Sequence, residues 1–279
     1  MNINPLNSTS KGKSLLAFFS LAVALYVPIA IYADVQVFPN WALINFGAFI
    51  PMLVALILVY RENGTASMVE LLKRPFDFKR IKSKIWYLPI FLIIPLTVLA
   101  QYGLALLFGL PVSSPYLPSW SPLLFAILFI AAIGEELGLM GYVIEPMQER
   151  FGALNASILL GIVQASYHIL LFTSSGMSSH WIVWQLIYIA ATRVLYAWIY
   201  NNTGKSIFAV VTMHTLFNMV WFLFPRNTAW VTLARPVFYN PAELAVITIV
   251  LATIVTFLWG SKTLARYRFA SSSQPSVEK

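Results

Sequence analysis

Long apolar segments separated by short polar stretches run through almost the whole chain. A helix that crosses a bilayer needs about 20 mostly apolar residues, and about eight segments reach that length. They lie near residues 14–33, 41–60, 85–108, 121–147, 154–173, 181–200, 205–224 and 242–260. The pattern predicts an all-α polytopic membrane protein, in which a bundle of about eight transmembrane helices forms one integral membrane domain over 1–279.

The composition agrees with this class of protein. Hydrophobic residues make up 59% of the chain and charged residues 10%, whereas soluble domains average about 25% charged residues. There is no cysteine, which excludes thiolate metal ligands and a cysteine nucleophile within this chain. The polar segment 269–279 is predicted to be a disordered tail.

Most of the 18 lysines and arginines lie on one side of the alternating spans, with a dense group in 61–84. The positive-inside rule therefore places both termini and the 61–84 segment in the cytoplasm, and the protein in the cell's inner (cytoplasmic) membrane. The net charge of +8 is a topology signal, so we expect no nucleic-acid binding. We interpret 61–84 as a basic, amphipathic cytoplasmic loop that contacts anionic lipids of the inner leaflet. A solvated loop without specific lipid contacts is an equally good interpretation.

Ionisable residues interrupt three of the apolar segments. Glu135 and Glu136 are adjacent in one span, and His168 and His214 lie in two others. Asn218 follows His214 by one helical turn and shares its face. From a helical rise of about 1.5 Å per residue, Glu135, His168 and His214 reach similar depths, about 15–20 Å from the cytoplasmic side. Because buried carboxylates in a membrane are costly, we interpret these residues as a reaction centre in a four-helix catalytic core over 120–224.

Structural interpretations compete with the functional one. A single intramembrane histidine is more often a hydrogen-bonded packing residue than a catalyst. The glutamate pair could instead form a salt bridge with Arg193 of another span, and such a bridge is also compatible with catalysis. We expect Gln101, Gln164 and Gln185 to form interhelical hydrogen bonds and His180 to be solvated in an outer loop.

The three motifs GEELGLMGYVIEPM, VQASYHILLF and VTMHTLFNMV resemble the CPBP family, the CAAX-protease and bacteriocin-processing (Abi) intramembrane glutamic endopeptidases. The family pattern is Glu-Glu-x-x-x-Arg, then Phe-x-x-x-His, then His-x-x-x-Asn/Asp. The resemblance covers about 120–224. This chain departs from the pattern at two positions, with Met140 in place of the arginine and Gln164 in place of the phenylalanine.

The resemblance implies an intramembrane endopeptidase. Glu135 with His168 would activate a water molecule, His214 and Asn218 would form an oxyanion hole, and Glu136 would tune the pair or hold the helix geometry. Arg193 is the candidate charge partner in place of the missing arginine. The substrate would be a membrane-anchored peptide or protein: a lipidated tail, a leader-bearing peptide or a transmembrane segment.

The need for a metal stays open at this point. Members of the family are often described as metalloproteases, and Glu135, His168 and His214 are candidate ligands for Zn²⁺. The His-Glu-x-x-His spacing of zinc peptidases is absent from the sequence, so we favour a mechanism that requires no cofactor.

Two other classes of function remain. A catalytically silent family member would act as an immunity or scaffold protein, and the departures at Met140 and Gln164 are consistent with that role. An ion or proton transporter would use the buried carboxylates and histidines as a path, but the sequence lacks the internal repeat typical of transporters.

Overall fold

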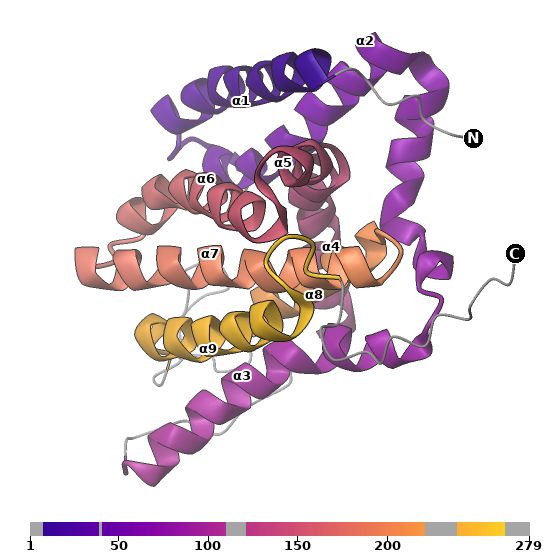
Figure 1. Cartoon of the computed structure of the whole chain (residues 1–279). Helices are drawn as coiled ribbons and strands as arrows, with labels where there is room; N and C mark the ends of the chain where they lie inside the picture. The colour runs from indigo at the N-terminus through magenta and orange to yellow at the C-terminus, as the bar shows by residue number, and fades with distance from the viewer. Residues whose placement is uncertain (1–7, 39–40, 110–120, 221–238, 266–279) are drawn as a thin grey trace, which may run out of the picture.

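The computed structural model describes residues 8–38, 41–109, 121–220 and 239–265, and these are almost entirely helical (Figure 1). The predicted tail 269–279 lies outside the described residues. In chain order the long helices are α1 (Ser8–Ile31), α2 (Ile50–Lys73), α3 (Tyr87–Leu107), α4 (Ser121–Gly138), α6 (Ala153–Ser174), α7 (Ser179–Asn202) and α9 (Pro241–Trp259). The shorter α5 (Ile144–Phe151) and α8 (Ile207–Met219) complete the set of described α-helices.

Short elements join some of these helices. A two-stranded antiparallel hairpin, β1 (Gln36–Phe38) and β2 (Trp41–Ala42), is followed by the 3-10 helix η1 (Leu43–Phe49). The 3-10 turns η2 (Arg74–Phe76), η3 (Phe78–Arg80) and η4 (Lys84–Trp86) connect α2 to α3. A π-helical segment, η5 (Leu139–Val143), joins α4 to α5.

Within the described residues, 7 helical segments are long and apolar enough to cross a membrane. The protein is therefore an all-α, polytopic integral membrane protein. The eighth predicted span, 205–224, contains α8, which has 13 residues and ends at Met219, and positions 221–224 of this span lie outside the described residues. Its apolar composition reflects burial among other helices, which a hydropathy pattern does not distinguish from contact with lipid.

The 61–84 segment was predicted to be a loop, but its first part is helical. Helix α2 continues through Lys73, with a break at Gly64, where φ is +77°. Glycine adopts this left-handed conformation readily, and α2 changes direction along its length (Figure 1). The remainder consists of the 3-10 turns η2 to η4.

Polar contacts tie this basic segment to the helices that carry the predicted reaction centre. Arg74 donates hydrogen bonds to the carbonyl oxygens of Gly141 in η5, at 3.2 Å, and of Lys205 before α8, at 2.8 Å. Asp77 accepts hydrogen bonds from the Ser206 hydroxyl at 2.7 Å and the Phe208 amide at 3.3 Å. A carboxylate at the start of a helix satisfies amides that have no intrahelical partner. The segment therefore fixes the start of α8.

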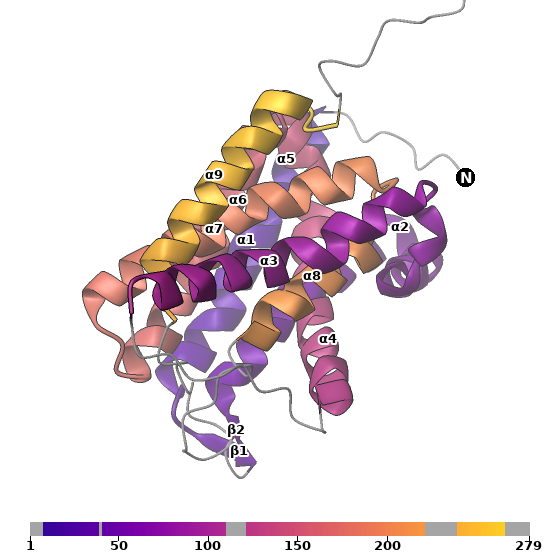
Figure 2. The ribbon, with the colours of Figure 1, turned by 90° about the horizontal axis from the view of Figure 1, so that it is seen from below.

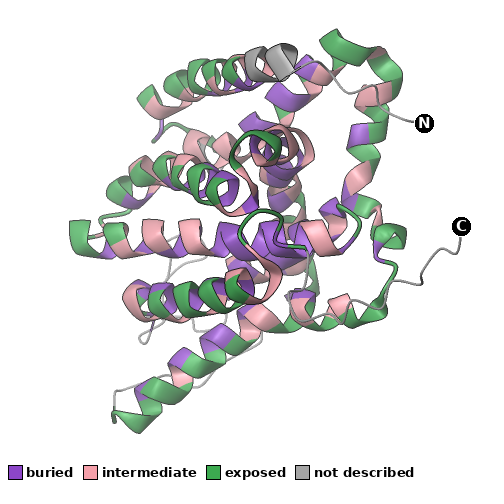
Figure 3. Ribbon diagram, viewed as in Figure 1, coloured by how far each residue is buried: buried purple, intermediate pink, exposed green. Residues whose placement is uncertain are grey.

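Helix α7 is the centre of the bundle. It packs between α6 and α9, and Figure 2 shows α4 and α8 crossing beneath this layer. In the most apolar stretch of α7, 61% of the residues are buried, compared with 17% in that of α1 and 22% in that of α9. The outer faces of α1, α3 and α9 are largely exposed (Figure 3), and they carry leucine, isoleucine, valine and phenylalanine. Apolar faces of this kind suit contact with lipid.

Glycines let the backbones of neighbouring helices approach closely. A Cβ at Gly161 of α6 would lie 2.8 Å from the Ala190 Cα of α7. In α4, a Cβ at Gly134 would lie 2.7 Å from the carbonyl oxygen of Ala48. A Cβ at Gly138 would lie 2.3 Å from the carbonyl oxygen of Pro51. Small residues four apart permit such close packing between membrane helices. The glutamate pair lies between the two glycines of α4.

Candidate active site

Glu135 and Glu136 lie in the last turn of α4, immediately before the π-helical segment η5. Adjacent residues on a helix differ in direction by about 100°, so the two carboxylates face different surroundings. Glu136 is fully buried, whereas the side chain of Glu135 keeps 13% of its surface exposed, toward a cavity. Single-turn π-helical segments occur frequently at functional sites.

Glu136 is held by two partners. Its carboxylate forms a two-point ion pair with Arg193 of α7, with Nη1–Oε2 at 2.6 Å and Nη2–Oε1 at 3.0 Å. The Nδ1 atom of His214 lies 2.7 Å from Oε1 of the same carboxylate. With both oxygens engaged and no exposed surface, Glu136 is a structural anchor for α7 and α8. It is poorly placed to contact a substrate.

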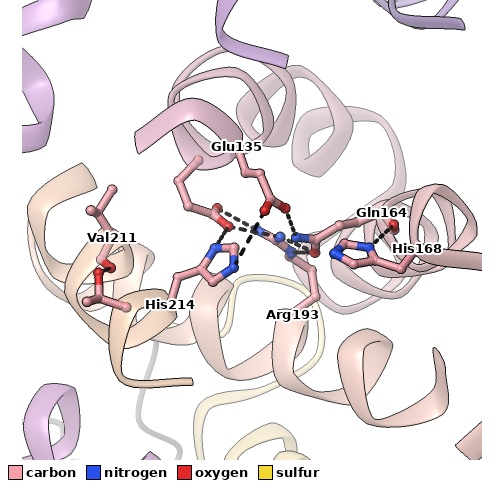
Figure 4. A network of polar contacts seen from close by, with 8 residues as sticks. Glu135, Gln164, His168, Arg193, Val211 and His214 are labelled. Carbon is pink, nitrogen blue, oxygen red and sulfur yellow. Dashed lines mark hydrogen bonds and ion pairs between the residues drawn. The ribbon is translucent and has the colours of Figure 1, made fainter. Parts of the chain in front are cut away.

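Glu135 has a different environment. Its Oε2 atom accepts a hydrogen bond from the side-chain amide of Gln164 in α6, at 2.8 Å. Its Oε1 atom lies 3.9 Å from Nε2 of His214, a separation too long for a direct hydrogen bond. Figure 4 shows the carboxylate of Glu135 directed toward Gln164 and the ring of His214. One oxygen is therefore fixed by the protein, and the other is available to a reactant.

His168 of α6 is oriented by its own helix. Its Nδ1 atom lies 3.0 Å from the backbone carbonyl oxygen of Gln164. A carbonyl oxygen only accepts hydrogen bonds, so Nδ1 carries the proton and Nε2 is left for another contact. The ring is partly exposed and lines the same cavity as Glu135.

Helix α8 contributes His214 and Asn218. Since Glu136 accepts the Nδ1 proton, the Nε2 atom of His214 is the one directed to Glu135. The ring packs against Tyr196 and Phe217, with ring centroids 5.8 Å and 6.2 Å away, which restricts its rotation. Asn218 is half-buried and also lines the cavity.

The cavity has a volume of about 290 Å³ and a mixed lining. Its polar wall holds Glu135, Gln164, His168, His214 and Asn218. The rest of the lining is largely apolar and includes Ile44, Leu128, Leu171, Phe172, Ile189 and Phe217. An apolar pocket with a few converging polar groups is typical of a ligand site.

The structure thus brings four of the residues singled out in the sequence to one cavity: Glu135, His168, His214 and Asn218. Glu136 and Arg193 form the ion pair behind that wall, and Glu136 does not line the cavity. His180 is exposed at the start of α7, where its Nε2 atom accepts a hydrogen bond from Trp184.

Sequence reasoning missed two features of the site. Gln164 was expected only to make an interhelical hydrogen bond, yet it contacts both Glu135 and Arg193. Tyr26 of α1 and Asn45 of η1 also line the cavity. Tyr26 donates a hydrogen bond to the Tyr167 carbonyl oxygen at 2.5 Å, which joins α1 to α6. The sequence signal that could have indicated a role for Gln164 in the site was its departure from the family pattern, which has phenylalanine at this position. No local signal marked Tyr26 or Asn45.

The candidate metal ligands do not form a metal-binding cluster in the described part of the chain, which contains no group of three or more His, Asp or Glu side chains placed to hold an ion. The Nδ1 atoms of both histidines are engaged by protein oxygens, which leaves their Nε2 atoms available for another contact. No step below is derived through a metal. The requirement for a cofactor stays a prediction.

Comparison with known proteins bears on the identity of this site. Residues 117–220 match the family described as type II CAAX prenyl endopeptidase Rce1-like, and this range contains Glu135, His168, Arg193, His214 and Asn218. The CAAX prenyl protease 2 of Methanococcus maripaludis is 27% identical to this chain over 189 residues, which cover 62% of this chain and 69% of that protein.

Over residues 117–220 the chain is similar to the CAAX prenyl endopeptidases, which agrees with the resemblance to the CPBP family. It is a protease, a CAAX-type intramembrane endopeptidase. The matched range covers α4 to α8, the helices that form the polar wall of the cavity. The residues of α1 and η1 that line the cavity, among them Tyr26, Ile44 and Asn45, lie outside that range.

Proposed function

We propose that this endopeptidase hydrolyses a peptide bond of a membrane-anchored peptide or protein, with Glu135 and His168 activating the water. The observation that carries the proposal is the position of Glu135. One of its oxygens is fixed by Gln164 at 2.8 Å, while the other faces the cavity lined by His168 and His214. A general base must reach both the water and the scissile bond, and this oxygen is the accessible one.

The reaction follows from the proton positions. A water molecule between Glu135 and His168 donates a proton to Glu135 as its oxygen attacks the scissile carbonyl carbon. His214, protonated on both nitrogens, and the amide of Asn218 donate hydrogen bonds to the developing oxyanion. The proton held by Glu135 then passes to the leaving amine, and the C–N bond breaks. The Glu136 carboxylate compensates the charge of the His214 ring through Nδ1.

The substrate is inferred from the lining of the cavity. Its apolar walls suit an apolar group beside the scissile bond, and the similar protein of Methanococcus maripaludis is named a prenyl protease. We therefore favour a lipidated tail, such as a prenylated one, over a leader-bearing or transmembrane peptide. Such substrates reside at the membrane surface, so anionic lipids around the basic segment 73–84 are the other expected partners.

Localisation follows the same distribution of charge. Backbone contacts bring several basic residues together. Arg74 of the basic segment contacts Lys205 before α8, and the Lys262 carbonyl oxygen after α9 accepts a hydrogen bond from the amide of Ala153 at the start of α6. We place these basic residues in the cytoplasm and the protein in the inner (cytoplasmic) membrane.

The direct test uses purified protein and a fluorogenic prenylated peptide. We expect Glu135→Gln to lower kcat by about 10²–10⁴-fold, because an amide cannot accept the proton of water. His180→Ala is the matched control, since His180 is exposed and outside the cavity, and its activity should equal that of the unaltered protein. A chelator should leave the rate unchanged. Full activity of Glu135→Gln would remove the basis of the mechanism.

One alternative is supported by a specific observation. Met140 is buried and apolar at the position where the family pattern has arginine, as expected for a silent immunity or scaffold protein. The unaltered protein would then fail to cleave peptides of any of the three substrate types. A transporter would move ions across vesicle membranes without cleaving peptide.

A further inference from the structure

The amide of Gln164 bridges the two charged centres of the site. Its Nε2 atom donates to Oε2 of Glu135 at 2.8 Å. Its Oε1 atom accepts hydrogen bonds from Arg193, from Nε at 3.1 Å and also from Nη2. The side chain is buried, with 4% of its surface exposed. The network therefore runs from His214 through Glu136, Arg193 and Gln164 to Glu135 (Figure 4).

Elementary chemistry fixes the direction of this amide. A guanidinium group only donates hydrogen bonds, and an ionised carboxylate only accepts them. Gln164 must therefore present its oxygen to Arg193 and its NH₂ group to Glu135. A group that does both, at this length and without charge, is an amide. An apolar side chain would leave the Nε atom of Arg193 and one oxygen of Glu135 without these partners.

The two departures from the family pattern are linked by this contact. Where the pattern has arginine, this chain has the buried, apolar Met140, and the cation comes from α7 as Arg193. Where the pattern has phenylalanine, this chain has Gln164, and a phenylalanine would make neither hydrogen bond. Gly161 permits the arrangement, since a Cβ there would lie 3.2 Å from the Cβ of Arg193.

We propose that Gln164 is a positioning residue that couples the general base to Arg193. By holding Oε2 of Glu135, it directs Oε1 into the cavity, and the guanidinium of Arg193 polarises the amide from its other side. Gln164 does not touch the reacting atoms in this scheme. The inference depends on the proposed role of Glu135, and the experiment separates the two.

Two variants test the coupling with the fluorogenic prenylated peptide. Gln164→Met conserves volume but removes the hydrogen bonds to Glu135 and Arg193, so kcat should fall about 10- to 100-fold with KM nearly unchanged, as expected for a misplaced base. Gln101→Met is the matched control. Gln101 also joins two helices, through the Asn240 carbonyl oxygen at 2.7 Å, but it does not line the cavity, and its kcat should be unaffected.

The pH dependence of Gln164→Glu distinguishes a positioning role from a purely structural one, which would not change the pH profile. The new carboxyl group faces Glu135 and Arg193, with Glu136, His168 and His214 beside them. Only its protonated form can donate to Glu135. We therefore expect little activity at neutral pH and partial recovery toward acidic pH, unlike the unaltered protein.

Unchanged kcat in Gln164→Met, or a pH profile of Gln164→Glu that matches the unaltered protein, would overturn the coupling. If Gln164→Met does not fold, as judged by thermal unfolding in detergent, the pH profile of Gln164→Glu decides alone. In either case loss of activity in Glu135→Gln would leave the proposed function standing. Full activity in Glu135→Gln would instead refute the proposed function itself.

Discussion

Glu136 and Arg193 form a two-point ion pair in which neither side chain has any exposed surface. The pair joins α4 to α7 in the centre of the bundle, and His214 of α8 binds the same carboxylate. Two charges are costly to remove from water, and their mutual attraction offsets that cost only while both partners are present. The pair therefore specifies which helix faces meet.

Arg193→Met should destabilise the protein strongly. Removal of one partner of a buried ion pair typically costs about 3–5 kcal/mol, because the other charge is left uncompensated. The double variant Glu136→Gln/Arg193→Met should be more stable than Arg193→Met alone. Thermal unfolding in detergent measures both, with Lys82→Met as an exposed control. Equal stability of the single and double variants would show that the pair does not behave as one unit.

His168→Ala should lose most activity without loss of stability. The ring is partly exposed at the cavity, and its Nδ1 atom contacts the carbonyl oxygen of Gln164 in its own helix. We expect a fall in kcat of about 10²–10⁴-fold, the usual contribution of general acid–base catalysis. Activity assays paired with thermal unfolding check this. A variant with lowered thermal stability and unchanged kcat would identify His168 as a packing residue.

Gly138→Ala should impair both folding and activity. The added Cβ would lie 2.3 Å from the Pro51 carbonyl oxygen, so α4 must move away from α2 and carry Glu135 with it. Overpacking of this kind costs about 1–3 kcal/mol. Gly103→Ala in α3 is the control, since a Cβ there meets nothing within 4 Å. Similar thermal unfolding of the two variants would contradict the close contact between α4 and α2.

The absence of native cysteine allows a direct test of topology. Ser83→Cys lies in the basic segment after α2, and Ser175→Cys lies in the connection between α6 and α7, and both positions are exposed. With both termini in the cytoplasm, a membrane-impermeant maleimide should label Ser175→Cys in intact cells. It should label Ser83→Cys only after the membrane is opened. The reverse pattern would invert the assigned orientation.

Much of the architecture could be predicted because membrane-crossing helices require long apolar segments, and their backbone hydrogen bonds are all internal. The prediction of a loop at 61–84 failed because composition does not determine geometry there. The segment after residue 60 is polar, yet α2 continues through it with a turn at Gly64.

The sequence by itself determined that this chain is a membrane-embedded helical protein and which ionisable residues lie within its apolar segments, where charges are rare and costly. Only the tertiary structure decided that Glu136 binds Arg193 while Glu135 faces the cavity, and that Gln164 connects them. Adjacent glutamates are equivalent in a hydropathy pattern. Their difference arises from the rotation of α4 and from the close approach of α6 to α7 at Gly161, which depend on packing between segments far apart in the chain.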